Sequence, residues 1–509
     1  MRRRTAQIIS RFYPALVRPF YSRGHAGALA CRLIVLAALA TAVQTSVMLV
    51  RKNRSKYPQL PTAGQPGVPR EPWSFRSLLS HFFSPSKPEE IFLFSTSHAG
   101  LLPSFPPRHE HTAVVPEAYP TLAGLEQQFN DLIRDFPHLA RLHHIGTSTA
   151  RLHPIIAIRL SDHPEIEEDE PAVLFTALHH AREPAGVYIC SALIQELLTN
   201  YEMSARHRRL LDSLDIWLVP LVNPDGYQYI LENQRQFPWW RKNLRDNDDD
   251  GQFNPLVDGV DLNRNYDYNW EEGGEGEAGS WFYRGRSAFS ETEIQTLRNL
   301  ELQQNFVIGV SFHSYGEAVL YPWGNFHRAP DQDLILDIAR QYASRIGRLS
   351  GQGAYNVLPL NGRVGQSSVW MYGAGGVIDF ICETGEEYFP PLDDLFHLSQ
   401  QNVNGAMFLL ERALRSGICG HVVDAETGAP LEAEIVVNGF ERNYVKPRHS
   451  HPEYGRFDRL LLPGVYEVHV QKKGYQTARF EKIEVRAETS TRLEVALHRE
   501  TPEDVMSNE

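Results

Sequence analysis

Between residues 119 and 415, short apolar runs alternate with amphipathic helical patterns, and this alternation limits the fold more than any other feature of the chain. A buried strand reads as an unbroken apolar run, whereas a half-buried helix repeats its apolar residues every three to four positions. Strands that alternate with helices predict an α/β fold with a mostly parallel or mixed central sheet flanked by helices. The strand candidates are 154–160, 172–178, 216–222, 306–312 and 376–382, and the helix candidates are 121–136, 187–198, 290–300, 332–348 and 394–414.

The composition changes on both sides of this α/β region, which we place at 118–415. Residues 57–117 are rich in Pro, Ser and Gly without sustained periodicity, which predicts a linker. Residues 416–499 contain short alternating strands separated by Gly, Pro and Asp turns, which predicts a small all-β sandwich. Residues 500–509 are expected to be an acidic tail.

Residues 1–56 combine many arginines with the apolar stretch Leu33–Val50. Ala40-Thr41-Ala42 fits a small-residue cleavage site, which predicts a secretory signal peptide with a long basic lead. The alternative is a short membrane anchor that is never cut, and basic residues on both of its sides leave the orientation open. In either case we expect an exported protein that is secreted, periplasmic or anchored facing outside the cytoplasm.

The charge and the cysteines exclude two classes of protein. A net charge of −12 is the opposite of the clustered Lys and Arg that phosphate contacts need, so we expect no nucleic-acid partner. Four cysteines in 509 residues are too few for a disulfide framework. A hydrophobic content of 42% is that of an ordinary globular protein, so the core must come from apolar packing.

The segment TALHHAREPAG, residues 176–186, lies between a predicted strand and a predicted helix, where α/β folds keep their chemistry. His180 and Glu183 are three positions apart, a spacing that turns both side chains towards one point. Together with His313, at the end of another predicted strand, they form a His₂Glu set that suits zinc and leaves a fourth position for water. The alternatives are a solvated loop and a buried histidine held by hydrogen bonds.

Glu383 follows the apolar strand 376–382, and burial raises the pKa of a carboxyl group. A raised pKa suits a general base that takes a proton from a metal-activated water near neutral pH. The alternative is a carboxylate that caps a helix or pairs with an arginine. Further along the chain are residues able to hold an anionic group near a metal, namely Arg241, Arg245, Asn263 and Arg264.

A second candidate metal site lies in RDNDDDGQFN, which places Asp246, Asp248 and Asp250 at alternate positions before Gly251. Hard oxygen ligands that alternate before a glycine turn are typical of the opening of a calcium loop. The twelfth position is Val257 instead of the bidentate glutamate of an EF-hand, so the match is partial. The alternative is a solvated acidic loop.

Seven motifs follow one another in the order found in zinc metallocarboxypeptidases of the carboxypeptidase A and B type, a family that residues 118–415 resemble. The motifs are HAREPAG, NPDGY, WRKNLR, GVDLNRNY, YRGRSAFSETE, SFHSYGEAVLYPWG and ICETG. The resemblance implies an α/β fold with a central mixed sheet, one zinc ion, and peptide or protein C-termini as substrates from which the last residue is released.

The resemblance also implies roles for individual residues. It makes His180, Glu183 and His313 the zinc ligands. It makes Glu383 the general base, which later acts as the acid towards the leaving amine. Arg241 becomes the fixed cation that stabilises the oxyanion of the tetrahedral intermediate.

The substrate contacts follow from the same comparison. Asn263 and Arg264 resemble the clamp on the terminal carboxylate of the substrate, and Arg182 and Tyr315 resemble accessory substrate contacts. Residues 416–499 resemble the transthyretin-like sandwich that follows the catalytic domain in regulatory carboxypeptidases, and YFPP after Glu383 is similar to that branch.

The chain departs from the family pattern in two places. The family has a mobile-loop tyrosine upstream of the tryptophan that is Trp370 here, and neither Tyr355 nor Tyr372 lies at the matching place. The position that selects the last side chain of the substrate corresponds to Ser368, which is neither acidic nor large and apolar. The preferred C-terminal residue therefore stays open.

Two other functions are compatible with the same residues. One is a related zinc amidase or peptidase that acts on cell-wall peptides. The other is a non-catalytic pseudoenzyme that binds peptides in the same pocket or on the β-sandwich. The presence of every hydrolytic part speaks against the pseudoenzyme, because decay usually removes a ligand or the base.

Overall fold

The structure is a computed structural model that describes residues 119–500 except 235, 305, 324–326 and 361–362. The predicted N-terminal segment 1–56, the linker 57–117 and the tail beyond residue 500 lie outside the described residues. Within the described part, no helix has the length and apolar character needed to cross a membrane.

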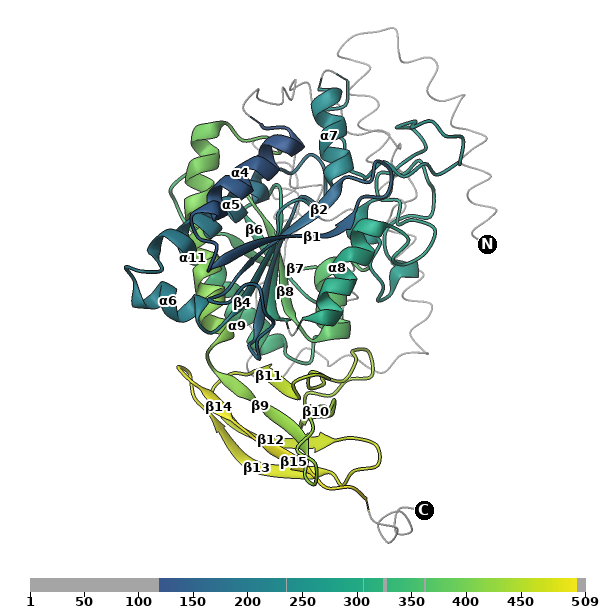
Figure 1. Cartoon of the computed structure of the whole chain (residues 1–509). Coiled ribbons are helices and arrows are strands. Elements are labelled where there is room, and N and C mark those ends of the chain that lie inside the picture. Colours follow the sequence, from purple (N-terminus) through teal and green to yellow (C-terminus); the bar gives the residue numbers. More distant parts are fainter. Residues whose placement is uncertain (1–118, 235, 305, 324–326, 361–362, 501–509) are drawn as a thin grey trace, which may run out of the picture. The chain divides into compact units, whose positions relative to one another are not determined.

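A mixed sheet forms the centre of the α/β domain (Figure 1). It has eight strands in the order β1-β2-β4-β3-β5-β8-β6-β7. Strands β4, β3, β5 and β8 run parallel, whereas β1 and β2 join antiparallel at one edge and β6 lies antiparallel to β8. The strands are β1 (Ala140–Thr147), β2 (Pro154–Leu160), β3 (Ala172–Ala177), β4 (Asp215–Val219), β5 (Phe306–His313), β6 (Ala318–Tyr321), β7 (Asn356–Pro359) and β8 (Ile378–Glu383). The predicted mixed sheet is thus confirmed.

The helices lie on both sides of this sheet and begin and end close to the predicted positions in most cases. In α4, apolar residues spaced four apart (Leu125, Phe129, Ile133) are buried, and Thr121 caps the helix by accepting a hydrogen bond from the Gly124 N–H. The helix predicted at 332–348 is shorter in the structure, where α9 ends at Ala343. The helices are α4 (Leu122–Arg134), α5 (Ala185–Asn200), α6 (Ala205–Leu211), α7 (Pro224–Glu232), α8 (Thr292–Gln303), α9 (Gln332–Ala343), α10 (Ser367–Trp370) and α11 (Leu392–Ala413).

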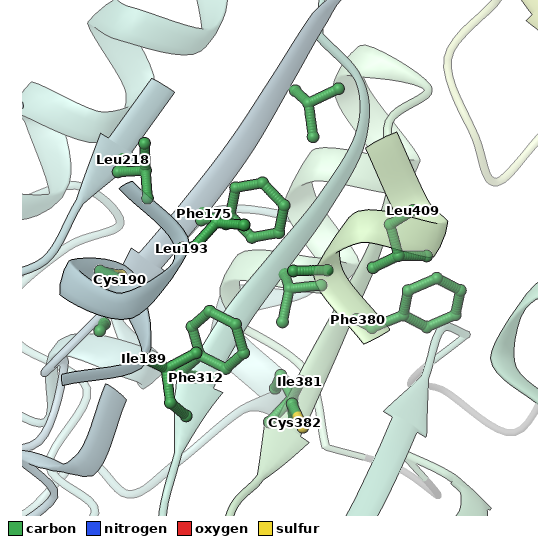
Figure 2. Packing of buried hydrophobic residues seen from close by; sticks show 14 of the residues in the cluster. Phe175, Ile189, Cys190, Leu193, Leu218, Phe312, Phe380, Ile381, Cys382 and Leu409 are labelled. Carbon is green, nitrogen blue, oxygen red and sulfur yellow. The ribbon is translucent and has the colours of Figure 1, made fainter. Parts of the chain in front are cut away.

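Strand β3 contributes side chains to an apolar core on each face of the sheet. Successive side chains of a strand point to opposite faces. Phe175 belongs to the apolar cluster shared with α5 and α11, and its ring stacks on Phe312 of β5 with centroids 6.2 Å apart (Figure 2). Leu174 belongs to the second cluster, shared with Leu297 of α8. The central strands are therefore packed between two apolar cores, which fix the positions of the strand ends.

The C-terminal strands form two sheets around a third apolar core. One sheet has the order β10-β12-β13, and the other has β11-β9-β14 with β15 also paired to β9. Val422 of β9 and Val468 of β12 are both fully buried in the shared core, as in a sandwich. The strands are β9 (Gly417–Asp424), β10 (Glu434–Val437), β11 (Arg456–Leu460), β12 (Gly464–Gln471), β13 (Ala478–Val485), β14 (Ser490–Arg492) and β15 (Val495–Leu497). The likeness to a transthyretin-like domain stays a prediction.

The three cysteines within the described residues, Cys190, Cys382 and Cys419, are free, and the first two are buried. This agrees with a core held by apolar packing.

Candidate active site

The carboxyl ends of three parallel neighbouring strands bring the predicted catalytic residues together. His180 and Glu183 lie in the loop between β3 and α5, and His313 is the last residue of β5. Glu383 is the last residue of β8 and stands opposite His313 in the strand register. Because β5 lies between β3 and β8, all four residues meet at one edge of the sheet.

The three predicted metal ligands point at one another. The Glu183 Oε2 atom lies 2.9 Å from His180 Nδ1 and 3.0 Å from His313 Nδ1, and the two Nδ1 atoms are 3.0 Å apart. Two donors bound to one tetrahedral zinc at about 2.0–2.1 Å are about 3.3 Å apart, so this spacing is close to that of a zinc site. Each residue is at most 4% exposed, so no water shell competes for these donor atoms. The set fits zinc.

The charge of Glu183 also fits a cation. Burial alone raises the pKa of its carboxyl group, but the facing imidazoles of His180 and His313 outweigh burial and hold the pKa well below its usual value. Glu183 is therefore ionised. Two imidazoles and one carboxylate form the donor set that zinc prefers at a catalytic site.

Asp261 orients the first histidine, a role that the sequence alone did not indicate. Its Oδ1 lies 3.2 Å from His180 Nε2, and its Oδ2 accepts a hydrogen bond from Arg241 Nε at 2.9 Å. Burial raises the pKa of the Asp261 carboxyl, but Arg241 and Arg264 outweigh it and hold the pKa well below its usual value. A carboxylate on the far nitrogen fixes which nitrogen faces the metal. The sequence signal that could have identified Asp261 is its place in GVDLNRNY, two residues before Asn263.

A second chain of hydrogen bonds, also not predicted, leads away from His313. Its Nε2 lies 3.1 Å from Ser311 Oγ, which lies 3.1 Å from His179 Nδ1. The His179 Nε2 atom is 2.8 Å from the Tyr266 hydroxyl. Burial, followed by the neighbouring His313 and His180, lowers the pKa of His179 well below its usual value, so His179 stays neutral and can both accept and donate. Ser311 lies two positions before His313, on the same face of β5.

Glu383 has the electrostatics expected of a base. Burial raises the pKa of its carboxyl group above the usual value, although the neighbouring His313 acts in the opposite direction. The side chain stays partly exposed, unlike the three ligand residues. A carboxylate with a raised pKa that solvent still reaches can take up a proton and return it.

The two arginines of WRKNLR have separate environments. Arg241 is 7% exposed, and its Nη1 lies 3.6 Å from Glu183 Oε1, so its charge is placed beside the metal ligands. Its backbone carbonyl also accepts a hydrogen bond from Ala181 N, which ties it to the ligand loop. Arg245 instead pairs with Glu291 at 3.1 Å, so its guanidinium is already occupied.

Asn263 and Arg264 lie next to the metal ligands. The Asn263 Nδ2 atom is 3.3 Å from His313 Nε2, and its Oδ1 accepts a hydrogen bond from Ser367 N at 3.0 Å. Burial lowers the pKa of Arg264 to about 10, still far above neutral pH, so the guanidinium is charged. Among the described residues, no carboxylate lies within 4.0 Å of it, which leaves a half-buried cation available for an anion from outside.

Arg182 and Tyr315 both contact the ring of Tyr388. The Arg182 guanidinium lies 4.3 Å from the centre of the Tyr388 ring, and Tyr315 packs edge-on against the same ring at 4.9 Å. The structure thus brings both predicted accessory residues together beside the ligand loop. Tyr388, which belongs to the YFPP motif, was not predicted to take part.

Neither tyrosine near Trp370 is available as a mobile-loop residue. Tyr355 accepts a hydrogen bond from Gly385 N, and Tyr372 donates one to Asp331; both are buried. Ser368 is fully buried, and its hydroxyl has no hydrogen-bond partner among the described residues. The roles of all these substrate residues stay predictions.

The acidic run forms a compact loop. Oxygen atoms of Asp246, Asp248 and Asp250 lie within 4.8 Å of one another near the surface. Two of them are used locally, because Asp246 accepts from Gly251 N and Asp250 accepts from Gln252 N. Exposed acidic groups gather in this way without an ion, so calcium there stays an untested prediction.

Comparisons with known proteins give a consistent result. Residues 125–405 match the family model described as zinc carboxypeptidase. A zinc carboxypeptidase from Saccharothrix mutabilis subsp. capreolus is 31% identical over 264 residues, which cover 50% of this chain but only 56% of that relative. Carboxypeptidase SOL1 from Arabidopsis thaliana is 23% identical over 372 residues, or 70% of this chain and 68% of that protein.

Among solved structures, thrombin activatable fibrinolysis inhibitor is similar with a TM-score of 0.51 and 21% identity, covering 57% of this chain and 73% of that one. A structural likeness at this identity shows the fold alone. It therefore supports the predicted central mixed sheet flanked by helices.

Proposed function

The chain belongs to the zinc carboxypeptidase family, and from that premise we propose that it is a zinc-dependent carboxypeptidase that hydrolyses C-terminal peptide bonds. The observation that carries the proposal is the convergence of donor atoms from His180, Glu183 and His313 at mutual distances of 2.9–3.0 Å, at the strand end where Glu383 also lies. A site with zinc donors alone would bind metal, whereas the adjacent base supports hydrolysis.

The proposed chemistry divides among few residues. Zinc, when bound by the three ligands, supplies a Lewis acid and activates water. Glu383 takes a proton from the attacking water and afterwards gives it to the leaving amine, which its raised pKa supports. Arg241, held in place by Asp261, offers a fixed cation to the oxyanion that develops on the scissile carbonyl.

Selection for the end of a peptide rests on Arg264 and Asn263. Arg264 is a charged guanidinium without a carboxylate partner in the described part of the chain, so a substrate carboxylate would complete the pair. A peptide bond one residue from that carboxylate would then lie near the metal ligands, because Asn263 contacts His313. Internal peptide bonds lack the anion, so we expect the enzyme to act only at C-termini.

Export is part of the proposal and is supported by the sequence of the first 56 residues. A basic lead followed by an apolar stretch and Ala40-Thr41-Ala42 supports cleavage by a signal peptidase. Expression of the full chain, cell fractionation and mass spectrometry of the mature N-terminus test it. A protein that keeps Met1 and stays in the cytoplasm would contradict export.

The hydrolytic proposal is tested with a peptide library whose members differ in the last residue. We expect release of C-terminal residues that a chelator abolishes and added zinc restores. Glu383→Gln should keep bound zinc and lose at least about a hundredfold in kcat. Glu386→Gln, which changes an exposed carboxylate three residues further along, is the matched control and should behave like wild type.

The results distinguish the alternatives. Activity on cell-wall peptides without release from ordinary peptides would favour the amidase, and zinc and peptide binding without turnover would favour the pseudoenzyme. Full activity of Glu383→Gln would refute the assigned base.

A further inference from the structure

The turn that joins the predicted specificity residue to the predicted base is an unusual piece of backbone. Helix α10, which contains Ser368, continues into the π-helical turn η5 (Met371–Gly375), and β8 follows and ends at Glu383. Single π-helical turns are rare and often mark functional sites. What holds this turn therefore affects the position of α10, which contains Ser368.

The loop between β10 and β11 of the sandwich donates hydrogen bonds to two successive carbonyl groups of this turn. Arg448 Nη1 donates to the Tyr372 carbonyl oxygen at 2.7 Å, and Lys446 N donates to the Gly373 carbonyl oxygen at 2.8 Å. The Arg448 guanidinium also lies 4.8 Å from the centre of the Tyr372 ring. Backbone and side chain of the turn are thus held by the same loop.

Arg459 of β11 reaches the same turn through Asp331, the residue before α9. Arg459 Nη2 donates to Asp331 Oδ1 at 2.6 Å, and the Tyr372 hydroxyl donates to Asp331 Oδ2 at 2.8 Å. Tyr372 is 0% exposed, Asp331 1% and Arg459 9%, so the ion pair is shielded from water. Removing one partner of such a pair leaves a buried charge without compensation.

The contact is closely packed at two glycines, one inside the turn and one directly after it. A Cβ atom on Gly376, whose φ is +83°, would lie 2.5 Å from Arg448 Cδ. A Cβ atom on Gly373 would lie 2.7 Å from both Trp323 and Tyr268. Glycine is required at both places because side chains of the neighbouring elements already fill the space.

From the turn, the connection to the site is short. The first residue of α10, Ser367, donates its backbone N–H to Asn263 Oδ1 at 3.0 Å. Trp370, the last residue of α10, packs on Tyr266, whose hydroxyl contacts His179. The position of α10 is therefore set at one end by Asn263 and at the other by the turn that the sandwich holds.

We propose that the C-terminal sandwich positions the substrate pocket, with Arg448 and Arg459 holding the Met371–Gly375 turn and thereby fixing α10 against Asn263. The inference rests on the proposed carboxypeptidase activity. Both arginines are positioning residues, since their hydrogen-bond partners are the turn and Asp331. A pocket wall that shifts should harm substrates whose last side chain fills the pocket and spare those that have none.

The test compares variants of the full chain on peptides that end either in glycine or in a large side chain. Arg448→Met and Arg459→Met should lower kcat/KM about ten- to a hundredfold for the large side chain and leave the glycine peptide near wild type. Arg459→Lys should restore part of the loss. Arg479→Met, an exposed arginine on β13, is the matched control and should change neither substrate.

Hydrogen exchange of the amides in residues 367–377 provides a readout independent of turnover. We expect faster exchange there in Arg459→Met while the strands of the sandwich core stay protected. If Arg459→Met does not fold, Tyr372→Phe removes only one hydroxyl and should give the same pattern at smaller size. Equal losses for both peptides, or unchanged exchange in 367–377, would overturn the proposal.

Failure of the proposed function gives a different result from failure of this inference. Wild-type protein without chelator-sensitive release would end the carboxypeptidase proposal, and exchange in 367–377 would still decide whether the sandwich holds the turn. An active wild type with variants indistinguishable from it would end the positioning role alone.

Discussion

Replacing Asp261 with asparagine removes a negative charge beside His180 Nε2, the nitrogen that faces away from the predicted metal. The volume of the side chain stays almost unchanged. The carboxylate lies 3.2 Å from His180 Nε2 and accepts from Arg241 Nε at 2.9 Å. Asparagine keeps one acceptor oxygen but places an N–H₂ group at the other position. Either His180 or Arg241 then faces a donor instead of an acceptor.

The magnitude follows from these two contacts. Loss of an orienting partner behind a metal ligand costs about ten- to a hundredfold in metal affinity, which is about 1.4–2.8 kcal/mol. Removing one partner of a buried pair costs about 3–5 kcal/mol of stability. We expect less than this for Asp261→Asn, because one acceptor stays and Arg241 keeps Glu183 at 3.6 Å.

Zinc affinity is measured by competition with a chromophoric chelator, and the stability of the metal-free protein by thermal unfolding. Asp267→Asn, an exposed aspartate six residues further along, is the matched control and should leave both quantities unchanged. A folded Asp261→Asn protein that binds zinc as tightly as wild type would refute the orienting role.

Two further predictions concern the folded state. Burial, followed by Glu291, raises the pKa of Glu293 from 4.5 to about 7, so the folded protein binds this proton more tightly than the unfolded chain, and the stability it contributes is lost as pH rises from about 4.5 through 7. Glu293→Gln lacks this loss, so its free energy of unfolding relative to wild type should rise between pH 5 and 8, by up to roughly 3 kcal/mol. The melting temperatures of both proteins across this pH range measure the change, and a difference independent of pH would contradict the prediction. Gly186→Ala would place a Cβ atom 2.7 Å from Ala177 and Phe312, so urea unfolding should show a loss of about 1–3 kcal/mol. In Gly276→Ala the Cβ atom would meet only Arg284 Nη2, at an ordinary contact distance of 3.8 Å, so this variant should show no loss.

The long central elements were predictable because their apolar patterns are unambiguous. Strands β3 and β5 are buried on both faces and read as continuous apolar runs. Strand β1 was missed because it is an edge strand with a partly exposed His143, an exposed His144 and a bulge after His144. Strands β6 and β7 have four residues each, too few for a periodic signal.

The site was predictable where its residues end strands or begin helices. His180, Glu183, His313 and Glu383 could be named because parallel strand ends meet at one edge of a sheet. Asp261 could not, because it lies in an irregular segment and its contact with His180 spans 81 positions. No strand end marks the position of Asp261, unlike the positions of His313 and Glu383.

The predicted helix 332–348 illustrates a different limit. Its apolar spacing continues to Ile346, which is buried, yet α9 ends at Ala343. Gly347 instead forms a bridge with Ala354, so the chain turns back on itself there. Periodicity records that a residue is buried, and a turn can bury it as well as a helix.

The order of the three converging strands along the chain also sets the order in which the predicted metal ligands and the proposed base are synthesised. His180 and His313 are separated by 133 positions, and Glu383 arrives later still, on β8. A polypeptide growing from its N-terminus therefore gathers its metal donors before its proposed base. Because such long loops must close before these strands can pair, we expect metal binding and the arrival of the proposed base to come late in folding.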